Sequence, residues 1–274
     1  MNKKKFIGAL LSAAICSLLT FSSCGEYQKI LKSGTPDQKL AYAQKAFEEK
    51  RYVQASTLLS DIVTVLKGNQ KAEDALYLLG LSYYENKDYP NASVCFKQYY
   101  ARYPKGKHSE LARFYCGYGY YLDSPDPQLD QSDTMHAIEE LQGFLDYFPQ
   151  SERVSIAQNA IFEMQDKLTL KELQSAQLYY NLGYFLNQNN YESAMVVAKN
   201  AIKTYPYSKY KEELEMLILK SKYQIAKESV DERKTDRYRQ VLDEYYSFIN
   251  NYPDGPNRDE AERIGRIAQS HVKD

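Results

Sequence analysis

The chain has 274 residues, of which 26% are charged and 14% aromatic, with 27 tyrosines and no tryptophan. Residues 1–23 contain three lysines and no acid, so the remainder holds 32 Lys and Arg against 36 Asp and Glu, a net charge of −4. This slightly acidic balance argues against nucleic acid as a partner, because such binding needs a basic stripe, and against a polybasic membrane-binding face.

The N-terminus has the pattern of a secretory signal. Three lysines at positions 3–5 precede an uncharged, mostly apolar stretch, residues 6–21, which is shorter than the roughly 20 residues that a membrane-spanning helix needs. The run Phe21-Ser22-Ser23-Cys24 resembles a bacterial lipobox, with Phe21 where leucine is commonest. We therefore expect residues 1–23 to be a signal peptide that is removed.

Cys24 would then become the first residue and carry a covalent lipid, with no other cofactor. Two or more acyl chains anchor a protein stably, so the domain itself need not touch the bilayer. Residues 24–35 are predicted to be a lipid-anchored linker. The alternative is an ordinary signal peptide followed by a chance cysteine.

Residues 73–106 match the 34-residue tetratricopeptide (TPR) repeat, which folds as two helices joined by a turn. The matching positions, in order, are Leu76, Leu79, Gly80, Tyr83, Tyr89, Ala92, Phe96, Tyr99 and Pro104. The first four have the i, i+3, i+4, i+7 spacing of an apolar helix stripe. Gly80 is predicted to let the second helix approach closely, and Pro104 to end that helix.

The second helix of this unit recurs three more times. Each copy has twelve residues from a small packing residue to a proline that follows an aromatic residue: Ala92 to Tyr103-Pro104, Ala137 to Phe148-Pro149, Ala194 to Tyr205-Pro206, and Val241 to Tyr252-Pro253. A weaker unit in the same frame spans residues 36–66 and ends at Lys67-Gly68, where a glycine can stop a helix in the left-handed conformation.

One such unit cannot bury its own apolar face, so neighbouring units must stack. The sequence therefore predicts an all-α fold, a TPR-like superhelical solenoid of about five helix-turn-helix repeats. Residues 36–150 would hold repeats one to three, and residues 151–274 would hold repeats four and five with a capping helix.

Three segments depart from the regular unit. Residues 123–133 carry two prolines and several acids without EF-hand spacing, and they predict an exposed loop, either solvated or used to dock a partner. No proline or glycine occurs between Pro149 and Gly183, so residues 151–188 predict one long or kinked helix, or two joined closely. Residues 231–236 predict a charged turn after a helix at 210–230, and residues 257–271 predict a polar terminal helix.

Few residues outside the N-terminus have a pattern that indicates chemistry. Cys95 and Cys116 lie on apolar helical stripes, which predicts buried thiols, although an oxidising compartment would permit a disulfide between them. His108, His136 and His271 are far apart in the sequence and are predicted to be surface residues. No phosphate-binding loop, nucleophile motif or metal-ligand spacing occurs, so we predict no catalytic residues, no metal site and no enzyme activity.

Aromatic side chains predict a peptide groove on the N-terminal repeats. In TPR arrays the first helix of each pair lines the concave surface, and positions offset from the packing stripe face into it. By that register the exposed set is Phe47, Tyr77, Tyr84, Phe114, Tyr118 and Tyr121. Such side chains bury much area at little entropic cost and can hydrogen-bond a peptide backbone. The alternative is that they pack against the next repeat.

The chain beyond the signal resembles the BamD family of outer-membrane assembly lipoproteins, also called YfiO or ComL. The resemblance is carried by Cys24 followed by Glu26-Tyr27, by the Ala-to-Tyr-Pro spacing, and by the insertion ending Leu129-Asp130-Gln131-Ser132-Asp133-Thr134 before Ala137-Ile138. It implies a periplasm-facing lipoprotein of the outer membrane, without enzyme activity.

The resemblance also implies two kinds of protein partner. A BamA-like outer-membrane barrel protein would dock through its periplasmic POTRA region on the C-terminal repeats, and unfolded outer-membrane β-barrel substrates would bind the N-terminal repeats. Both would serve the folding and insertion of barrel proteins. The alternative is a generic TPR lipoprotein that scaffolds another periplasmic complex.

Overall fold

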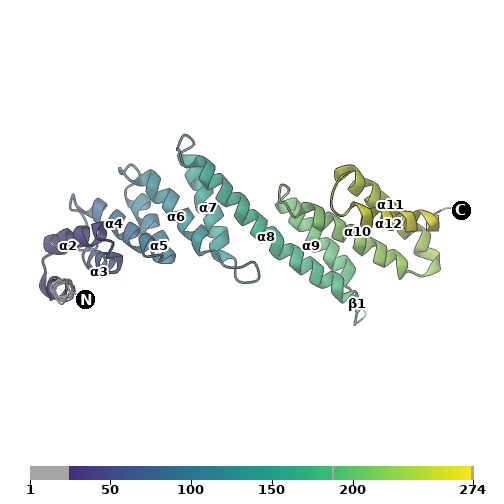
Figure 1. The fold of residues 1–274 in the computed structure, drawn as a ribbon, viewed down its shortest axis with the longest axis horizontal. Helices are drawn as coiled ribbons and strands as arrows, with labels where there is room; N and C mark the ends of the chain where they lie inside the picture. Colours follow the sequence, from purple (N-terminus) through teal and green to yellow (C-terminus); the bar gives the residue numbers. More distant parts are fainter. Residues whose placement is uncertain (1–24, 187, 273–274) are drawn as a thin grey trace, which may run out of the picture. The chain divides into compact units, whose positions relative to one another are not determined.

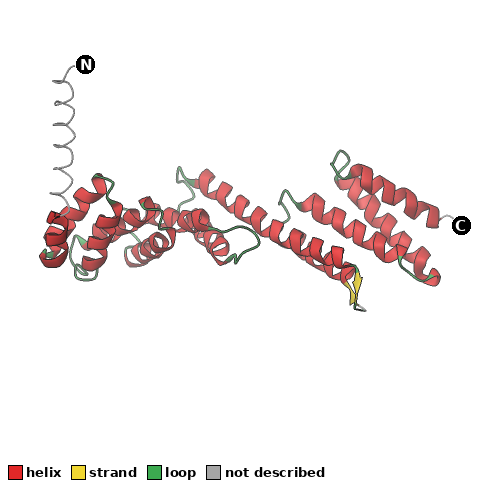
Figure 2. Cartoon of the chain, turned by 60° about the horizontal axis from the view of Figure 1, so that its bottom comes forward, coloured by secondary structure: helices red, strands yellow, loops and turns green. Residues whose placement is uncertain are grey.

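The computed structural model describes residues 25–186 and 188–272, and almost all of these residues are helical (Figures 1 and 2). The elements in chain order are α2 (Pro36–Glu48), α3 (Tyr52–Ile62), α4 (Ala72–Glu85), α5 (Tyr89–Arg102), α6 (Ser109–Asp123), α7 (Ser132–Tyr147), α8 (Val154–Leu182), β1 (Tyr184–Phe185), β2 (Gln188–Asn189), α9 (Asn190–Thr204), α10 (Lys211–Lys227), α11 (Asp231–Asn251) and α12 (Arg258–Val272). The predicted signal peptide and Cys24 lie outside the described residues.

The helices form five consecutive pairs, α2–α3 to α10–α11, followed by α12, in the part of the chain that the structure describes. The predicted all-α, TPR-like fold is confirmed. Helix α4 approaches α5 at Gly80, where an added Cβ would lie 2.8 Å from Cε1 of Phe96. The second helix of a pair also contacts the first helix of the next, as α5 does with α6 and α11 with α12.

Each predicted aromatic-proline pair ends a helix. The N–H of the aromatic residue donates to the carbonyl four residues earlier, from Tyr103 to Tyr99 (2.8 Å), Phe148 to Phe144 (2.9 Å), Tyr205 to Ala201 (2.8 Å) and Tyr252 to Phe248 (2.9 Å). The proline that follows has no N–H and disfavours a helical residue before it, so the helix goes no further.

An acidic side chain on the first helix of a pair accepts a hydrogen bond from the turn that precedes the first helix of the next pair or, after the last pair, from the turn that precedes α12. We call these contacts the acidic clasps. Glu73 accepts from the N–H of Lys107 (3.0 Å), Glu110 from the hydroxyl of Ser151 (2.6 Å), Asp166 from the N–H of Lys209 (3.1 Å) and Glu212 from the N–H of Asn257 (3.1 Å). These charge-assisted bonds satisfy groups next to helix N-termini, whose first N–H groups have no partner within the helix. The consensus repeat pattern did not predict this series of clasps.

The chain divides into two compact units, residues 1–123 with 139–157 and residues 124–138 with 158–274. In the first unit, buried Leu58, Leu59 and Leu79 belong to one cluster, and Phe96, Tyr99 and Cys116 to the next. In the second unit, α10, α11 and α12 share a cluster that includes Tyr238, Phe248 and Ile264. The terminal helix therefore covers an apolar face, as a cap does.

Residues 25–33, within the predicted lipid-anchored linker at 24–35, are helical. Tyr27, Ile30 and Leu31 pack against the first core cluster. Their i, i+3, i+4 spacing is that of an amphipathic helix, so burial of these three side chains favours helix over free linker. After α3, Gly68 has the predicted left-handed conformation, with φ of 90°.

The insertion in the third pair is shorter than predicted, since Asp123 ends α6 and Ser132 begins α7. It is exposed at Asp126 and at residues 128–130, as predicted, and hydrogen bonds also join it to α8. Lys167 Nζ donates to the carbonyl (3.1 Å) and hydroxyl (2.7 Å) oxygens of Ser124, and Gln128 Nε2 donates to Gln174 Oε1 (3.1 Å). Burial lowers the pKa of Lys167 from its ordinary value.

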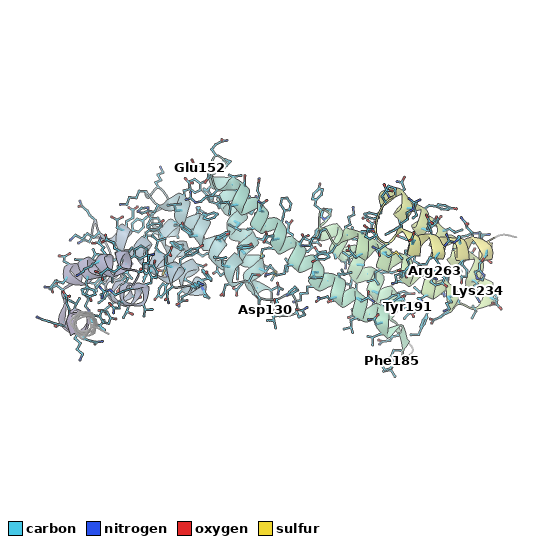
Figure 3. All side chains as sticks on the ribbon, in the orientation of Figure 1. Asp130, Glu152, Phe185, Tyr191, Lys234 and Arg263 are labelled. Atoms are coloured by element: carbon cyan, nitrogen blue, oxygen red, sulfur yellow. The ribbon has the colours of Figure 1, made fainter. Side chains whose placement is uncertain are left out.

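The predicted long segment is one helix, α8, of 29 residues. It ends at Leu182 and not at 188, because Gly183 takes a positive φ of 56° and starts a short antiparallel hairpin, with Tyr184 opposite Asn189. Figure 3 shows Phe185 on this hairpin. None of the helices in residues 25–186 and 188–272 is long and apolar enough to cross a bilayer.

The predicted charged turn at residues 231–236 is wrong, because α11 begins at Asp231. Asp231 and Glu232 stand in its first turn, where carboxylates interact favourably with the helix dipole. The predicted thiols are as expected: Cys95 and Cys116 are both buried and free, and no disulfide joins them.

Candidate peptide-binding face

The six predicted groove residues all come from the first helices of the first three pairs. Phe47 is on α2, Tyr77 and Tyr84 are on α4, and Phe114, Tyr118 and Tyr121 are on α6. All six therefore lie on first helices, as the register assumed. The burial of the six side chains differs, and this separates those that support the core from those that a ligand could reach.

Tyr77 and Phe114 were predicted to be exposed, and this is wrong: they are only 7% and 5% exposed. The Tyr77 ring stacks on the imidazole of His108, with centroids 3.9 Å apart and planes 4° apart, and burial raises the Tyr77 pKa to about 12. Phe114 packs edge-on against Phe144, with centroids 5.5 Å apart. For these two residues the packing alternative holds.

Four partly exposed tyrosines and the buried Phe114 form a row of rings across α4 and α6, which we call the aromatic ladder: Tyr84, Tyr115, Phe114, Tyr118 and Tyr121. Consecutive ring centroids are 4.8, 5.6, 5.1 and 5.0 Å apart. Phe114 is the buried rung that supports the others. Tyr115 was missed, because its sequence position assigned it to no groove-facing register, yet it joins the α4 tyrosine to the α6 rings.

Tyr84 is the ring at the α4 end of the ladder. Its ring also meets Tyr89 at 5.5 Å, and burial, followed by neighbouring tyrosines, raises its pKa above the ordinary value. The phenol, like any tyrosine with a pKa of about 10 or above, is protonated at neutral pH and can donate a hydrogen bond. The ladder thus offers flat apolar faces bordered by hydroxyl donors, which suits contact with aromatic or aliphatic side chains and with peptide carbonyls.

Phe47 lies apart from the ladder at a separate hollow of about 460 Å³, which is also lined by Tyr77, Asp74, Lys107 and His108. Lys107 Nζ forms an ion pair with Asp74 at 2.7 Å. His108 was predicted to be a surface residue, but it stacks on Tyr77 as described above. Burial and the charge of Lys107 lower the pKa of His108, so the imidazole is neutral at physiological pH.

No cluster of three or more His, Cys, Asp or Glu side chains that could hold a metal ion occurs in the described ranges, 25–186 and 188–272. His136 is exposed on α7, and His271 stacks on Tyr238 at 4.1 Å near the end of α12. The three histidines do not come together.

Two comparisons relate the chain to known proteins. The family described as YfiO, outer membrane lipoprotein, matches residues 33–190, which is more than half of the chain and includes every residue of the aromatic ladder. A protein of Aquifex aeolicus (strain VF5), named putative outer membrane protein assembly factor BamD, is 24% identical over 253 residues. The alignment covers 88% of this chain and 83% of that protein.

Proposed function

This chain belongs to the YfiO family of outer membrane lipoproteins, and from that premise we propose that it is an adaptor subunit in the assembly of outer-membrane β-barrel proteins. It binds a BamA-like barrel protein and unfolded barrel substrates, and it promotes their folding and insertion without an enzyme activity of its own. The observation that carries this proposal is that the family match includes both helix pairs, α4–α5 and α6–α7, that carry the aromatic ladder.

The ladder suits an unfolded barrel strand as ligand. The lipid-facing side of a barrel strand is apolar and is bordered by aromatic residues at both membrane interfaces. Before insertion, these side chains and the backbone have no partners. The rings of Tyr84, Tyr115 and Tyr118 can cover such side chains, while their hydroxyls bond the backbone, as in peptide recognition by surfaces with matched side-chain sites.

Attachment to the membrane is proposed to come from the lipid on Cys24, with the helical repeats facing the periplasm. The helical residues 25–33 then leave almost no free chain between Cys24 and the first core cluster, against which Tyr27 and Ile30 pack. On this proposal the first helix pairs, and not a distant domain, are held close to the bilayer surface.

A pulldown with the tagged protein from membranes in mild detergent tests the assembly role. We expect a BamA-like barrel protein to be retained. Recovery of soluble envelope proteins alone would instead favour the alternative, a generic TPR lipoprotein that scaffolds another periplasmic complex.

The ladder is tested by the double variant Tyr84→Ala, Tyr118→Ala with a peptide from the C-terminal strand of a barrel protein. We expect the Kd to rise about tenfold, which corresponds to about 1.4 kcal/mol. Tyr207→Ala is the matched control, since Tyr207 is 88% exposed and lies outside the ladder. Equal affinity of the double variant and the control would assign the ladder to packing, and Tyr84→Phe keeps the ring if the alanine variant loses helicity.

A further inference from the structure

The second unit contains a hollow of about 570 Å³ between the C-terminal half of α8 and the N-terminal half of α10. Ten residues line it: Leu173, Gln174, Gln177, Leu178, Asn181, Glu213, Met216, Leu217, Lys220 and Asn257. We call it the α8–α10 groove. It uses the first helices of the fourth and fifth pairs, as the aromatic ladder uses those of the second and third.

The α8 side of this groove carries no charge. From Leu173 to Tyr191 the sequence contains no Asp, Glu, Lys, Arg or His, in a chain that is 26% charged. The stretch runs along the last turns of α8, through the hairpin with Phe185, to Tyr191 at the start of α9 (Figure 3). A solvated helix face normally carries charged residues, so their absence indicates a surface that a partner covers.

Side-chain carboxamides, and not charged groups, provide the polar atoms on this side of the groove. The hydrogen bonds that they already form leave some of their donor and acceptor atoms available to a ligand. Gln174 Oε1 accepts from Gln128 (3.1 Å), and Asn181 Oδ1 accepts from Gln177 (2.8 Å), which leaves the side-chain N–H groups of Gln174 and Asn181 as donors.

The opposite groups remain open as acceptors. Asn257 Nδ2 donates to Glu212 Oε1 (3.1 Å), so the amide oxygens of Asn257 and Gln177 are left to accept. A surface that mixes open donors and acceptors matches the N–H and C=O groups of one extended peptide backbone.

The other residues that line the groove favour particular side chains in the ligand. Leu178 is 60% exposed, and with Leu173 and Met216 it offers apolar contact. Lys220 is already engaged, because its Nζ lies 3.4 Å from Glu260 and 5.6 Å from the centre of the Tyr180 ring. Glu213 has no ion pair with any other residue in the described parts of the chain, so it favours a basic side chain at one end of the ligand.

We propose that the α8–α10 groove binds one extended strand of an unfolded polypeptide through its backbone, with apolar side chains on Leu178 and a single Lys or Arg near Glu213. A folded partner could meet these carboxamides only with side chains or an exposed strand edge, because its other backbone groups are already paired. The inference rests on the proposed function only in that the occupant is a segment of an unfolded barrel substrate. It adds a second strand site, separate from the aromatic ladder.

The test uses site-specific cross-linking in the intact protein in mild detergent. A photoreactive phenylalanine derivative replaces Leu178 in one variant and Val196 in the other. Val196 is a matched control, since it is 57% exposed on α9 and does not line the groove. The probe is a labelled ten-residue peptide of alternating Val and Thr with one terminal Lys, and its partner probe is the same peptide N-methylated at alternate residues.

We expect the parent peptide to cross-link at 178 at least about tenfold more than at 196, and N-methylation to remove this signal because it removes backbone donors. Equal cross-linking at both positions, or equal cross-linking by both peptides, would overturn the proposal. The pulldown of a barrel protein is scored separately, so it can succeed while the groove fails. Leu178→Lys, compared with Val196→Lys, repeats the test without the photoreactive group.

Discussion

Helices α6 and α7 approach each other at Gly117, and the contact there makes a quantitative prediction possible. An added Cβ would lie 2.8 Å from both Cγ and the backbone N of Leu141. Since one of these atoms belongs to the backbone, no change of rotamer relieves the clash, and the two helices must separate. Gly143 of α7 is the opposite case, because a Cβ there would meet no atom within 4 Å.

We expect Gly117→Ala to lower the free energy of unfolding and Gly143→Ala to raise it. Overpacking a core costs about 1–3 kcal/mol, while exchanging glycine for alanine inside a helix contributes about 1 kcal/mol in the other direction. The net loss for Gly117→Ala is then about 1 kcal/mol, or about 2–4 °C in Tm for a domain of this size. Gly143→Ala has only the favourable contribution, up to about 1 kcal/mol.

Thermal unfolding followed by circular dichroism, with both variants and the parent protein measured side by side, gives the comparison. Two identical chemical changes within one helix pair should thus shift the Tm in opposite directions. A Gly117→Ala variant that melts at or above the parent protein would mean that the close approach of α6 and α7 is absent.

Three further predictions concern the anchor, the Tyr77 stack and the acidic clasps. Cys24→Ser should move the protein from the membrane to the soluble fraction with unchanged helicity, and persistent sedimentation in high salt would contradict a lipid on Cys24. Burial and the Lys107 charge hold the folded pKa of His108 below its ordinary value of 6.5, so its contribution to stability is complete above about pH 6.5 and is lost as the pH falls through the lowered pKa. His108→Phe, which keeps a ring against Tyr77, should therefore flatten the decline in the urea midpoint between about pH 7 and pH 5, and an unchanged slope would exclude His108 as its source. Asp166→Ala removes the acceptor for the Lys209 N–H and the Ser208 hydroxyl and should cost about 1–2 kcal/mol, whereas equal stability in urea would mean that water replaces the clasp without loss.

The repeats could be predicted because their determinants are local. A small residue, an aromatic residue and a proline at fixed spacing decide where a second helix packs and ends, as the N–H bonds of Tyr103 and Tyr252 illustrate. The acidic clasps could not be predicted in the same way. Glu73 and Lys107 are separated by a whole repeat, and only the stacking of neighbouring pairs brings them together.

The segments that were predicted wrongly are those where one residue type suits two structures. Asp231 and Glu232 are typical of a charged turn, but the same carboxylates favour the first turn of a helix. The hairpin after Gly183 was missed because two-residue strands are too short to show an alternating pattern.

The groove residues show what helical register can decide and what it cannot. Register assigned Tyr77 and Tyr84 to the same side of α4, and both contact Phe96. It could not show that His108, from the turn before α6, lies flat on Tyr77 and removes it from solvent. Coverage by a neighbouring turn depends on the stacking geometry, which no single repeat encodes.

The two buried thiols make it possible to measure how readily individual repeat interfaces open. Global unfolding reports only an average over all of these interfaces. Cys95 lies in the cluster of the first two helix pairs, and Cys116 in the cluster that joins the second pair to α6. Burial raises the pKa of Cys95 to about 12 and that of Cys116 as well, so neither thiol reacts while its interface is closed. Under native conditions, the alkylation rate of each thiol therefore measures the free energy needed to open its own interface. Two adjacent junctions of the array can thus be compared in a single sample, without a probe added to either.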